Sequence, residues 1–123
     1  MCHQTVSLVA RHLEASGFPT VIIGSARDIV EQAAVPRFLF TDYPLGNPCG
    51  PPGDTDTQRA IVAMGLDLLA LAFAPQTTVQ TAFSWPTDSW KHDFMRVDPA
   101  KTEEYLALGV ARQKKQAAAP TRN

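Results

Sequence analysis

The chain has 123 residues, of which 45% are hydrophobic and 19% charged, and its formal net charge is -1 at pH 7. This balance is that of a single globular domain and excludes collagen-like, coiled-coil and disordered chains. A net charge this close to zero supplies no basic surface for a phosphate backbone, so nucleic acid is not an expected partner.

The compartment follows from the N-terminus, the apolar runs and the cysteines. The first residues lack the basic and apolar regions of a signal peptide. The longest apolar run, residues 60–74, contains Asp67 and is shorter than the about 20 residues that cross a bilayer. Two cysteines, Cys2 and Cys49, are too few for a disulfide framework. We therefore expect a cytoplasmic protein with reduced thiols and no membrane contact.

Helix and strand patterns alternate from the start of the chain. Apolar residues recur on one face of residues 4–16, which predicts a helix that Gly17 and Pro19 end. Residues 20–24 form a short β-branched run, typical of a strand buried on both faces of a parallel sheet. Residues 37–42 indicate a second strand of the same kind.

A capping pattern and a stiff loop separate these strands from the next helix. Ser25 followed by Asp28 resembles a capping box and predicts a short helix to about residue 33. Residues 43–54 are rich in proline and glycine, which predicts a shaped loop without regular structure. Asp54 or Thr55 should then cap the longest helix, which ends near residue 73.

The last third of the chain is less regular. Residues 77–83 alternate weakly and predict an edge strand, and the aromatic residues of 84–97 favour packing over a sheet edge. Asp98 and Pro99 have the types preferred at a helix start and predict a last helix to about residue 113. The polar residues 114–123 are expected to form a flexible tail.

The element order predicts an α/β fold, a three-layer Rossmann-like half with a small parallel sheet. Residues 1–113 would form one α/β domain. A βαβ unit needs a strand directly before the first helix, yet the sequence opens on that helix. We therefore expect the C-terminal part of a longer domain, whose N-terminal strand is missing or is supplied by a partner.

Cys2 is the first candidate for chemistry. The dipole and free N–H groups at a helix start favour a thiolate, and the 44–54 loop with Cys49 should open on the same sheet edge. Cys2 would then be a redox or nucleophilic thiol whose substrate the loop frames. His3 could tune that thiol or relay a proton, although adjacent helical side chains point apart. The structural alternatives are incidental cysteines and a capping or solvent-facing histidine.

Ser25 is a candidate for anion binding, because it follows a strand and opens a helix, where N–H groups and a hydroxyl can meet a carboxylate. The structural alternative is ordinary helix capping. The cysteines and histidines lack the spacing of a zinc site, and no glycine-rich phosphate loop occurs. Neither a metal nor a nucleotide cofactor is therefore expected.

Three features in a fixed order resemble a known family. A cysteine opens a helix, a Gly-Phe-Pro-Thr-Val segment (residues 17–21) leads into a strand, and a Pro-Leu-Gly-Asn-Pro loop (residues 44–48) follows. Together they resemble the C-terminal part of the selenoprotein B family, which comprises glycine, sarcosine and betaine reductases and the related D-proline reductase subunit. The resemblance covers approximately residues 2–71.

This resemblance implies a reductase that cleaves a small amino-acid-like substrate through a selenol or thiol nucleophile. Cys2 matches the resolving thiol, with His3 and Thr5 as further catalytic candidates. The residues expected to orient the substrate, shape the loop over it or act as a second redox thiol are Ser25, Gly46, Asn47 and Cys49. The expected partners are a small carboxylate or amine, reductase subunits and a thioredoxin-like electron donor.

In that family the nucleophile lies three positions before the resolving cysteine, which here falls upstream of Met1. Selenocysteine is encoded by UGA, a codon normally read as stop. We therefore expect the C-terminal piece of a longer selenoprotein, begun at the methionine codon after an in-frame UGA. The alternatives are a small subunit that borrows its nucleophile, a catalytically silent scaffold whose 85–94 segment docks a partner, and a truncated product without function.

Overall fold

The computed structural model describes residues 2–93, 96 and 98–118. Its contacts divide the chain into two compact units, Met1–Asp88 and Ser89–Asn123. Among the described residues, no helix is both long and apolar enough to cross a membrane.

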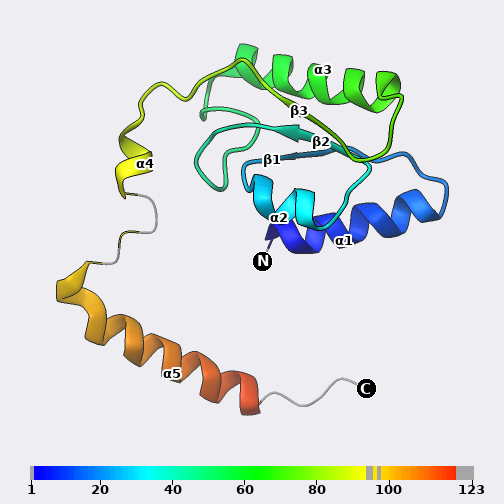
Figure 1. The fold of residues 1–123 in the computed structure, drawn as a ribbon. Helices are drawn as coiled ribbons and strands as arrows, with labels where there is room; N and C mark the ends of the chain where they lie inside the picture. The colour runs from blue at the N-terminus through cyan, green and yellow to red at the C-terminus, as the bar shows by residue number, and fades with distance from the viewer. Residues whose placement is uncertain (1, 94–95, 97, 119–123) are drawn as a thin grey trace. The chain divides into compact units, whose positions relative to one another are not determined.

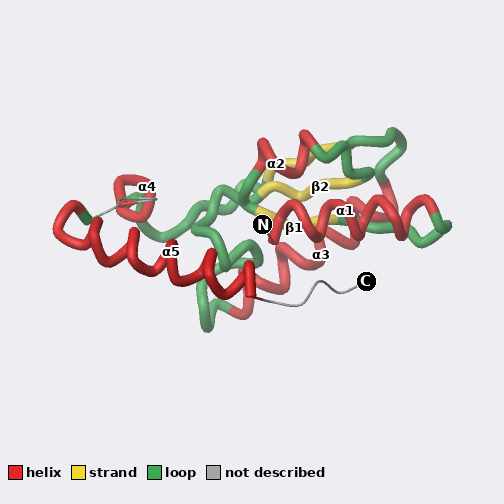
Figure 2. The backbone as a smooth tube through the Cα atoms, turned by 90° about the horizontal axis from the view of Figure 1, so that it is seen from below, coloured by secondary structure: helices red, strands yellow, loops and turns green. Residues whose placement is uncertain are grey.

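The first unit is built on a small parallel sheet (Figures 1 and 2). Its strands are β1 (Ile22–Gly24), β2 (Arg37–Phe40) and β3 (Thr77–Gln80), in the order β1-β2-β3. Both pairings are parallel, with Gly24 opposite Phe40 and Phe40 opposite Gln80. The predicted α/β fold with a small parallel sheet is therefore confirmed, and β2 is its central strand.

Helices cover both faces of this sheet (Figure 1). On one face, α1 (Cys2–Ala15) and α2 (Arg27–Gln32) pack around Phe38. On the other face, α3 (Thr55–Leu71) packs around Leu39. Neighbouring residues of a strand point to opposite faces, so β2 contributes to both apolar clusters. The result is the expected three layers.

The two crossover connections differ in hand. The strand order advances in one direction, while α2 and α3 lie on opposite faces. One of the two connections is therefore left-handed, which is rare for parallel strands. The long segment 41–54 joins the carboxyl end of β2 to the start of α3 on the other face of the sheet.

Capping explains where the helices begin, with one correction. Asp54 caps α3 as predicted, since its carboxylate accepts from the Thr57 N–H at 3.1 Å. The predicted capping box at Ser25 is wrong. The cap of α2 is Ala26, which makes no side-chain hydrogen bond, and the Ser25 hydroxyl lies 3.5 Å from that of Thr41 instead.

The second unit contains α4 (Ser89–Asp93), the 3₁₀ turn η1 (Pro99–Lys101) and α5 (Thr102–Ala118). The predicted cap is confirmed, because the Asp98 carboxylate accepts from the Ala100 N–H at 3.0 Å. The helix continues past residue 113, where we expected its end, because the lysines, glutamine and alanines that follow favour helix. Residues 119–123 of the expected tail lie outside the described residues, as does Phe94 of the aromatic segment.

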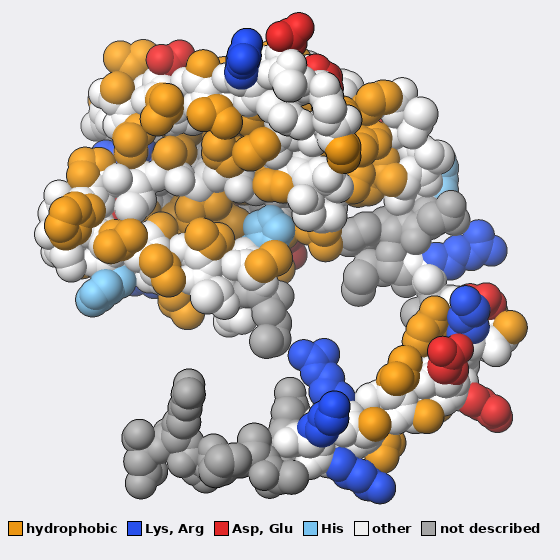
Figure 3. Space-filling view, turned by 180° about the vertical axis from the view of Figure 1, so that it is seen from behind, with side chains coloured by type: hydrophobic (Ala, Val, Ile, Leu, Met, Phe, Trp, Pro, Cys, Tyr) orange, Lys and Arg blue, Asp and Glu red, His pale blue; other side chains and the backbone are white. Residues whose placement is uncertain are grey.

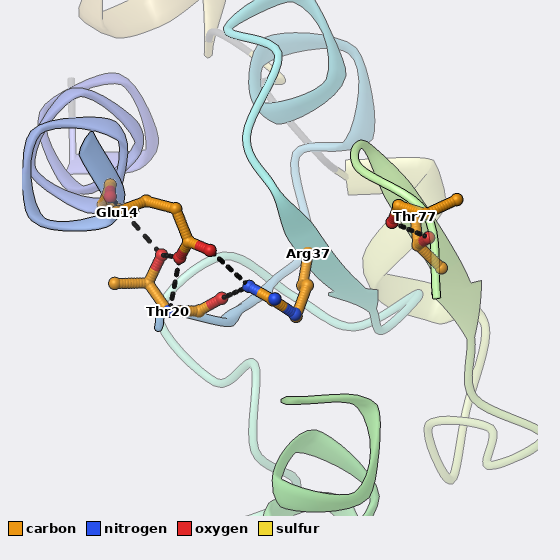
Figure 4. A network of polar contacts seen from close by, with 6 residues as sticks. Glu14, Thr20, Arg37 and Thr77 are labelled. Carbon is orange, nitrogen blue, oxygen red and sulfur yellow. Dashed lines mark hydrogen bonds and ion pairs between the residues drawn. The ribbon is translucent and has the colours of Figure 1, made fainter. Parts of the chain in front are cut away.

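A charged network ties α1 to the sheet (Figure 4). The Glu14 carboxylate accepts from Arg37 Nη1 at 2.8 Å, the Thr20 N–H at 2.7 Å and the Thr20 hydroxyl at 2.9 Å. The hydrogen bond from Arg37 is the main cause of a lowered pKa for Glu14. The network therefore holds the end of α1 to Thr20, two residues before β1, and to the start of β2.

Leu39→Ala should lower the free energy of unfolding by about 2–5 kcal/mol, because it leaves a cavity between β2 and α3. Leu39 is completely buried, whereas Leu71 at the end of α3 is 75% exposed. Leu71→Ala, the matched control, should change stability by less than about 0.5 kcal/mol. Urea titration followed by circular dichroism measures both. Equal losses in the two variants would contradict this core.

Glu14→Gln should cost about 1–2 kcal/mol of stability at pH 7, because it removes a charge that accepts three hydrogen bonds. The native pKa of Glu14 lies below its ordinary value of 4.5, so its stabilisation is present above pH 4.5 and is lost as the pH falls through the native value. The difference between wild type and variant should therefore shrink in acid.

Glu31→Gln is the control for this experiment. Glu31 pairs with Arg27 at 3.0 Å across an exposed helix turn. Exposed pairs of this kind contribute about 0.3–0.5 kcal/mol. Denaturant titrations from pH 3 to pH 7 measure both variants, and a pH-independent loss in Glu14→Gln would show that the charge is not responsible.

Candidate functional site

The carboxyl ends of the strands carry the candidate site. The sheet ladder continues one step beyond the strands, because the Thr41 N–H donates to the Gly24 carbonyl at 3.0 Å. A peptide's C=O and N–H point in opposite directions, so the Ser25 N–H points away from β2, out of the β1 edge. The acceptor that meets it is His3 Nε2, at 3.2 Å. The start of α1 and the end of β1 are thereby joined.

Gly24 makes this close approach possible. A Cβ on Gly24 would lie 3.1 Å from His3 Cδ2 and 3.2 Å from His3 Nε2. These distances are shorter than ordinary contacts between carbon atoms. The imidazole therefore rests against backbone that carries no side chain.

Cys2 lies next to this histidine. Its side chain is exposed, and its Sγ is 3.6 Å from His3 Nδ1. Our expectation that the two adjacent side chains point apart is not what the structure shows. The imidazole thus contacts the thiol through Nδ1 and the sheet edge through Nε2.

Hydroxyl groups extend the site along the sheet. The Ser25 Oγ lies 3.5 Å from Thr41 Oγ1, and Thr41 is completely buried. The Thr41 hydroxyl also donates to the Gly24 carbonyl at 3.4 Å. Sequence reasoning considered Gly24 only together with Ser25, as a possible anion site, and missed Thr41. Their positions at the ends of predicted strands were the available signal.

The loop candidates lie in the turns before α3. Gly46 is exposed with φ +95°, which favours glycine. Asn47 donates its N–H to the Pro44 carbonyl at 3.1 Å and accepts from the Gly50 N–H at 3.2 Å. Cys49 is half-buried and, like Cys2, is a free thiol. Within the described part of the chain, no hydrogen bond or disulfide links Gly46, Asn47 or Cys49 to Cys2.

The remaining candidate, Thr5, is exposed on α1. The structure therefore brings together Cys2, His3 and Ser25. In the part of the chain that the structure describes, no group of three or more His, Cys, Asp or Glu side chains could hold a metal ion.

Tyr43 is a buried residue that sequence reasoning did not single out. It follows β2, is 1% exposed, and meets the Trp85 ring edge-on with ring centroids 5.4 Å apart. Its hydroxyl has no hydrogen-bond partner among the described residues. Burial raises the pKa of Tyr43, and the nearby Asp54 carboxylate adds to this effect. Trp85 thus packs onto the sheet as predicted.

A cavity of about 330 Å³ lies at the opposite end of the strands, where Arg37 begins β2. Glu14, Arg37 and Gln76 are among its lining residues. Arg37 is already paired with Glu14. The residues that line this cavity do not include Cys2, His3 or Ser25, so the cavity does not form part of the candidate site.

Comparison with known proteins provides one informative match. Over 68 residues the chain is 35% identical to the D-proline reductase subunit gamma of Acetoanaerobium sticklandii. The match covers 55% of this chain, which spans only 28% of the length of that relative. No protein-family model and no solved structure matches. The similarity supports a relation to a reductase family.

Tyr43→Phe should leave the free energy of unfolding unchanged or raise it by up to about 1 kcal/mol, because it removes a buried hydroxyl without a partner. The raised pKa of Tyr43 also means that wild type loses stability above the ordinary value of 10.0, where the unfolded phenol ionises first. The variant should lack this alkaline loss.

Tyr105→Phe is the matched control, since Tyr105 is 46% exposed. Denaturant titrations at pH 7 and pH 10.5 compare the three proteins. A loss above about 1 kcal/mol in Tyr43→Phe at pH 7 would show that the hydroxyl has a hydrogen-bond partner in solution.

Proposed function

We propose that this chain carries the resolving thiol of a reductase related to D-proline reductase, and that Cys2 is that thiol. One observation carries the proposal: Cys2 is exposed at the start of α1, with an imidazole nitrogen 3.6 Å from its sulfur. The similarity to a reductase subunit supports it. An exposed thiol is available to a reactive group that lies outside residues 1–123.

The proposed reaction begins at that outside group, a selenolate or thiolate. It attacks the substrate carbon, the C–N bond breaks, and the electron pair leaves with the nitrogen, which takes up a proton. The Cys2 thiolate then attacks the selenium or sulfur of the adduct. The bond from that atom to carbon breaks, the carbon takes up a proton, and a bond to the Cys2 sulfur forms. An external dithiol donor of the thioredoxin kind reduces this bond with two electrons.

The chain's polar groups suit a small substrate with a carboxylate or amine. Ser25, whose backbone N–H meets His3, carries a hydroxyl next to that of Thr41 that can donate to a carboxylate. Thr5 is assigned a supporting role on α1, and Gly46, Asn47 and Cys49 shape the loop. We place this reaction in the cytoplasm, where thiols stay reduced, with further reductase subunits as partners.

A silent scaffold is the second candidate, and exposed apolar side chains favour it. Figure 3 shows hydrophobic groups spread over the surface of the Met1–Asp88 unit. On α1 they form an apolar stripe at helical spacing, in which Val6, Val9 and Leu13 are 45%, 50% and 39% exposed. Contiguous apolar surface is what protein partners cover, and this stripe is the feature of α1 that favours the scaffold. Trp85, by contrast, is packed against Tyr43 and not free to dock a partner.

The deciding experiment compares Cys2→Ser with Cys49→Ser in the complete reductase assembly. We expect Cys2→Ser to lower the rate of C–N bond cleavage in D-proline or another small amino acid by roughly 1,000-fold or more. Cys49→Ser, which alters the loop and not the proposed resolving thiol, should lower that rate far less. Full activity in Cys2→Ser would contradict the resolving role and favour the scaffold.

A further inference from the structure

We propose that the backbone N–H of Ser25 holds His3 in the tautomer protonated on Nδ1, which makes His3 a hydrogen-bond donor to the Cys2 sulfur and not a base that removes the thiol proton. His3 is thus a positioning residue. This inference rests on the proposed function for its meaning in catalysis, but its geometry can be tested without any turnover.

The first step concerns the Ser25 N–H. A backbone N–H only donates, and an N–H that points out of a sheet edge needs an acceptor. His3 Nε2 lies 3.2 Å from the Ser25 nitrogen and is that acceptor. It can accept only through its lone pair, so Nε2 carries no proton.

The second step follows from the chemistry of imidazole. A neutral histidine has one N–H, so a proton absent from Nε2 must sit on Nδ1. Nδ1 lies 3.6 Å from Cys2 Sγ, within hydrogen-bonding distance of sulfur. The Nδ1–H therefore donates to the thiol and supports the negative charge that develops when the sulfur becomes a nucleophile.

The third step excludes the two usual roles of a histidine beside a cysteine. A base that accepts the thiol proton at Nδ1 would start with its proton on Nε2. An imidazolium paired with a thiolate would carry protons on both nitrogens. In either form two N–H donors would face each other at 3.2 Å, and the Ser25 N–H would lose its acceptor. The proton of Cys2 therefore leaves to the solvent that reaches the exposed thiol.

The ring is held where this argument needs it. Gly24 lies against Cδ2 and Nε2, where a Cβ would come within 3.1–3.2 Å. The hydroxyl of the fully buried Ser7 donates to the His3 carbonyl at 2.7 Å, which fixes the backbone of the same residue. Thr41 in turn donates to the Gly24 carbonyl through both its N–H and its hydroxyl. These hydrogen bonds fix the backbone at the sheet edge that the imidazole contacts.

Nitrogen NMR tests the tautomer directly. In the full chain with ¹⁵N-labelled histidine, long-range proton–nitrogen correlations distinguish protonated from unprotonated ring nitrogens. The His3 signals are assigned by their absence in His3→Asn, and His12 and His92 serve as internal references. We expect a protonated Nδ1 and an unprotonated Nε2 in His3 at pH 7.5. A proton on Nε2, or on both nitrogens, would overturn the inference.

Alkylation of Cys2 by iodoacetamide tests the consequence, with Cys49 of the same molecule as the control thiol. His3→Phe should slow the reaction of Cys2 about tenfold, as expected for the loss of one charge-assisted hydrogen bond. His3→Asn should restore most of the rate, because its amide N–H₂ can replace Nδ1–H as a donor. Gly24→Ala should also slow Cys2, because it displaces the ring. The Cys49 rate should be constant throughout.

These outcomes separate the inference from the proposed function. Asparagine can donate a hydrogen bond but cannot act as a base, and phenylalanine can do neither. Equal slowing in His3→Asn and His3→Phe would therefore indicate that the lost property is the base, which would contradict the donor role. If His3 is protonated on Nδ1 but Cys2→Ser retains full reductase activity, the proposed function fails and the inference about the tautomer stands. Circular dichroism of each variant shows that an altered Cys2 rate does not reflect unfolding.

Discussion

A sheet of three parallel strands has one interior strand, and both faces of that strand must be shielded from water. In β2 the two central residues, Phe38 and Leu39, are 1% and 0% exposed. Helices must therefore cover both faces, α1 and α2 on one side and α3 on the other. Because each helix runs back along the strands, α1 and α3 both begin at the carboxyl edge. The position of the candidate site is thus a result of how the core is buried.

The edge of the same sheet also positions His3, the residue that contacts the candidate thiol. Ladder hydrogen bonds satisfy the Gly24 carbonyl, but the N–H of the next residue, Ser25, points outward and takes its acceptor from α1. His3 accepts the hydrogen bond from this backbone N–H and also contacts the sulfur of Cys2, the candidate thiol. Fold and reactivity are therefore coupled through one imidazole. The apolar stripe on α1 lies on the same helix, so a partner that covers it would also approach Cys2.

Much of the fold was predictable because its signals are local. The β-branched run before Gly24 and the capping residues Asp54 and Asp98 each act within a few residues of the chain, and the structure confirms them. The capping box at Ser25 failed because its hydroxyl has a competing neighbour, Thr41, on the next strand. The site itself depends on contacts between segments distant in sequence. Cys2 and Ser25 were named from position alone, but nothing local indicates that one imidazole lies between them.

Gly24 gives this arrangement a signature that evolution can leave in related chains. The space that its absent side chain would fill is occupied by the ring of His3. A residue larger than glycine at position 24 would press on this ring and require it to move, so we expect the two positions to vary together. A chain that keeps the imidazole at position 3 favours glycine at position 24, whereas a chain without that ring has no such requirement. A glycine at position 24 of a related chain would therefore indicate that the room for a ring at position 3 is retained.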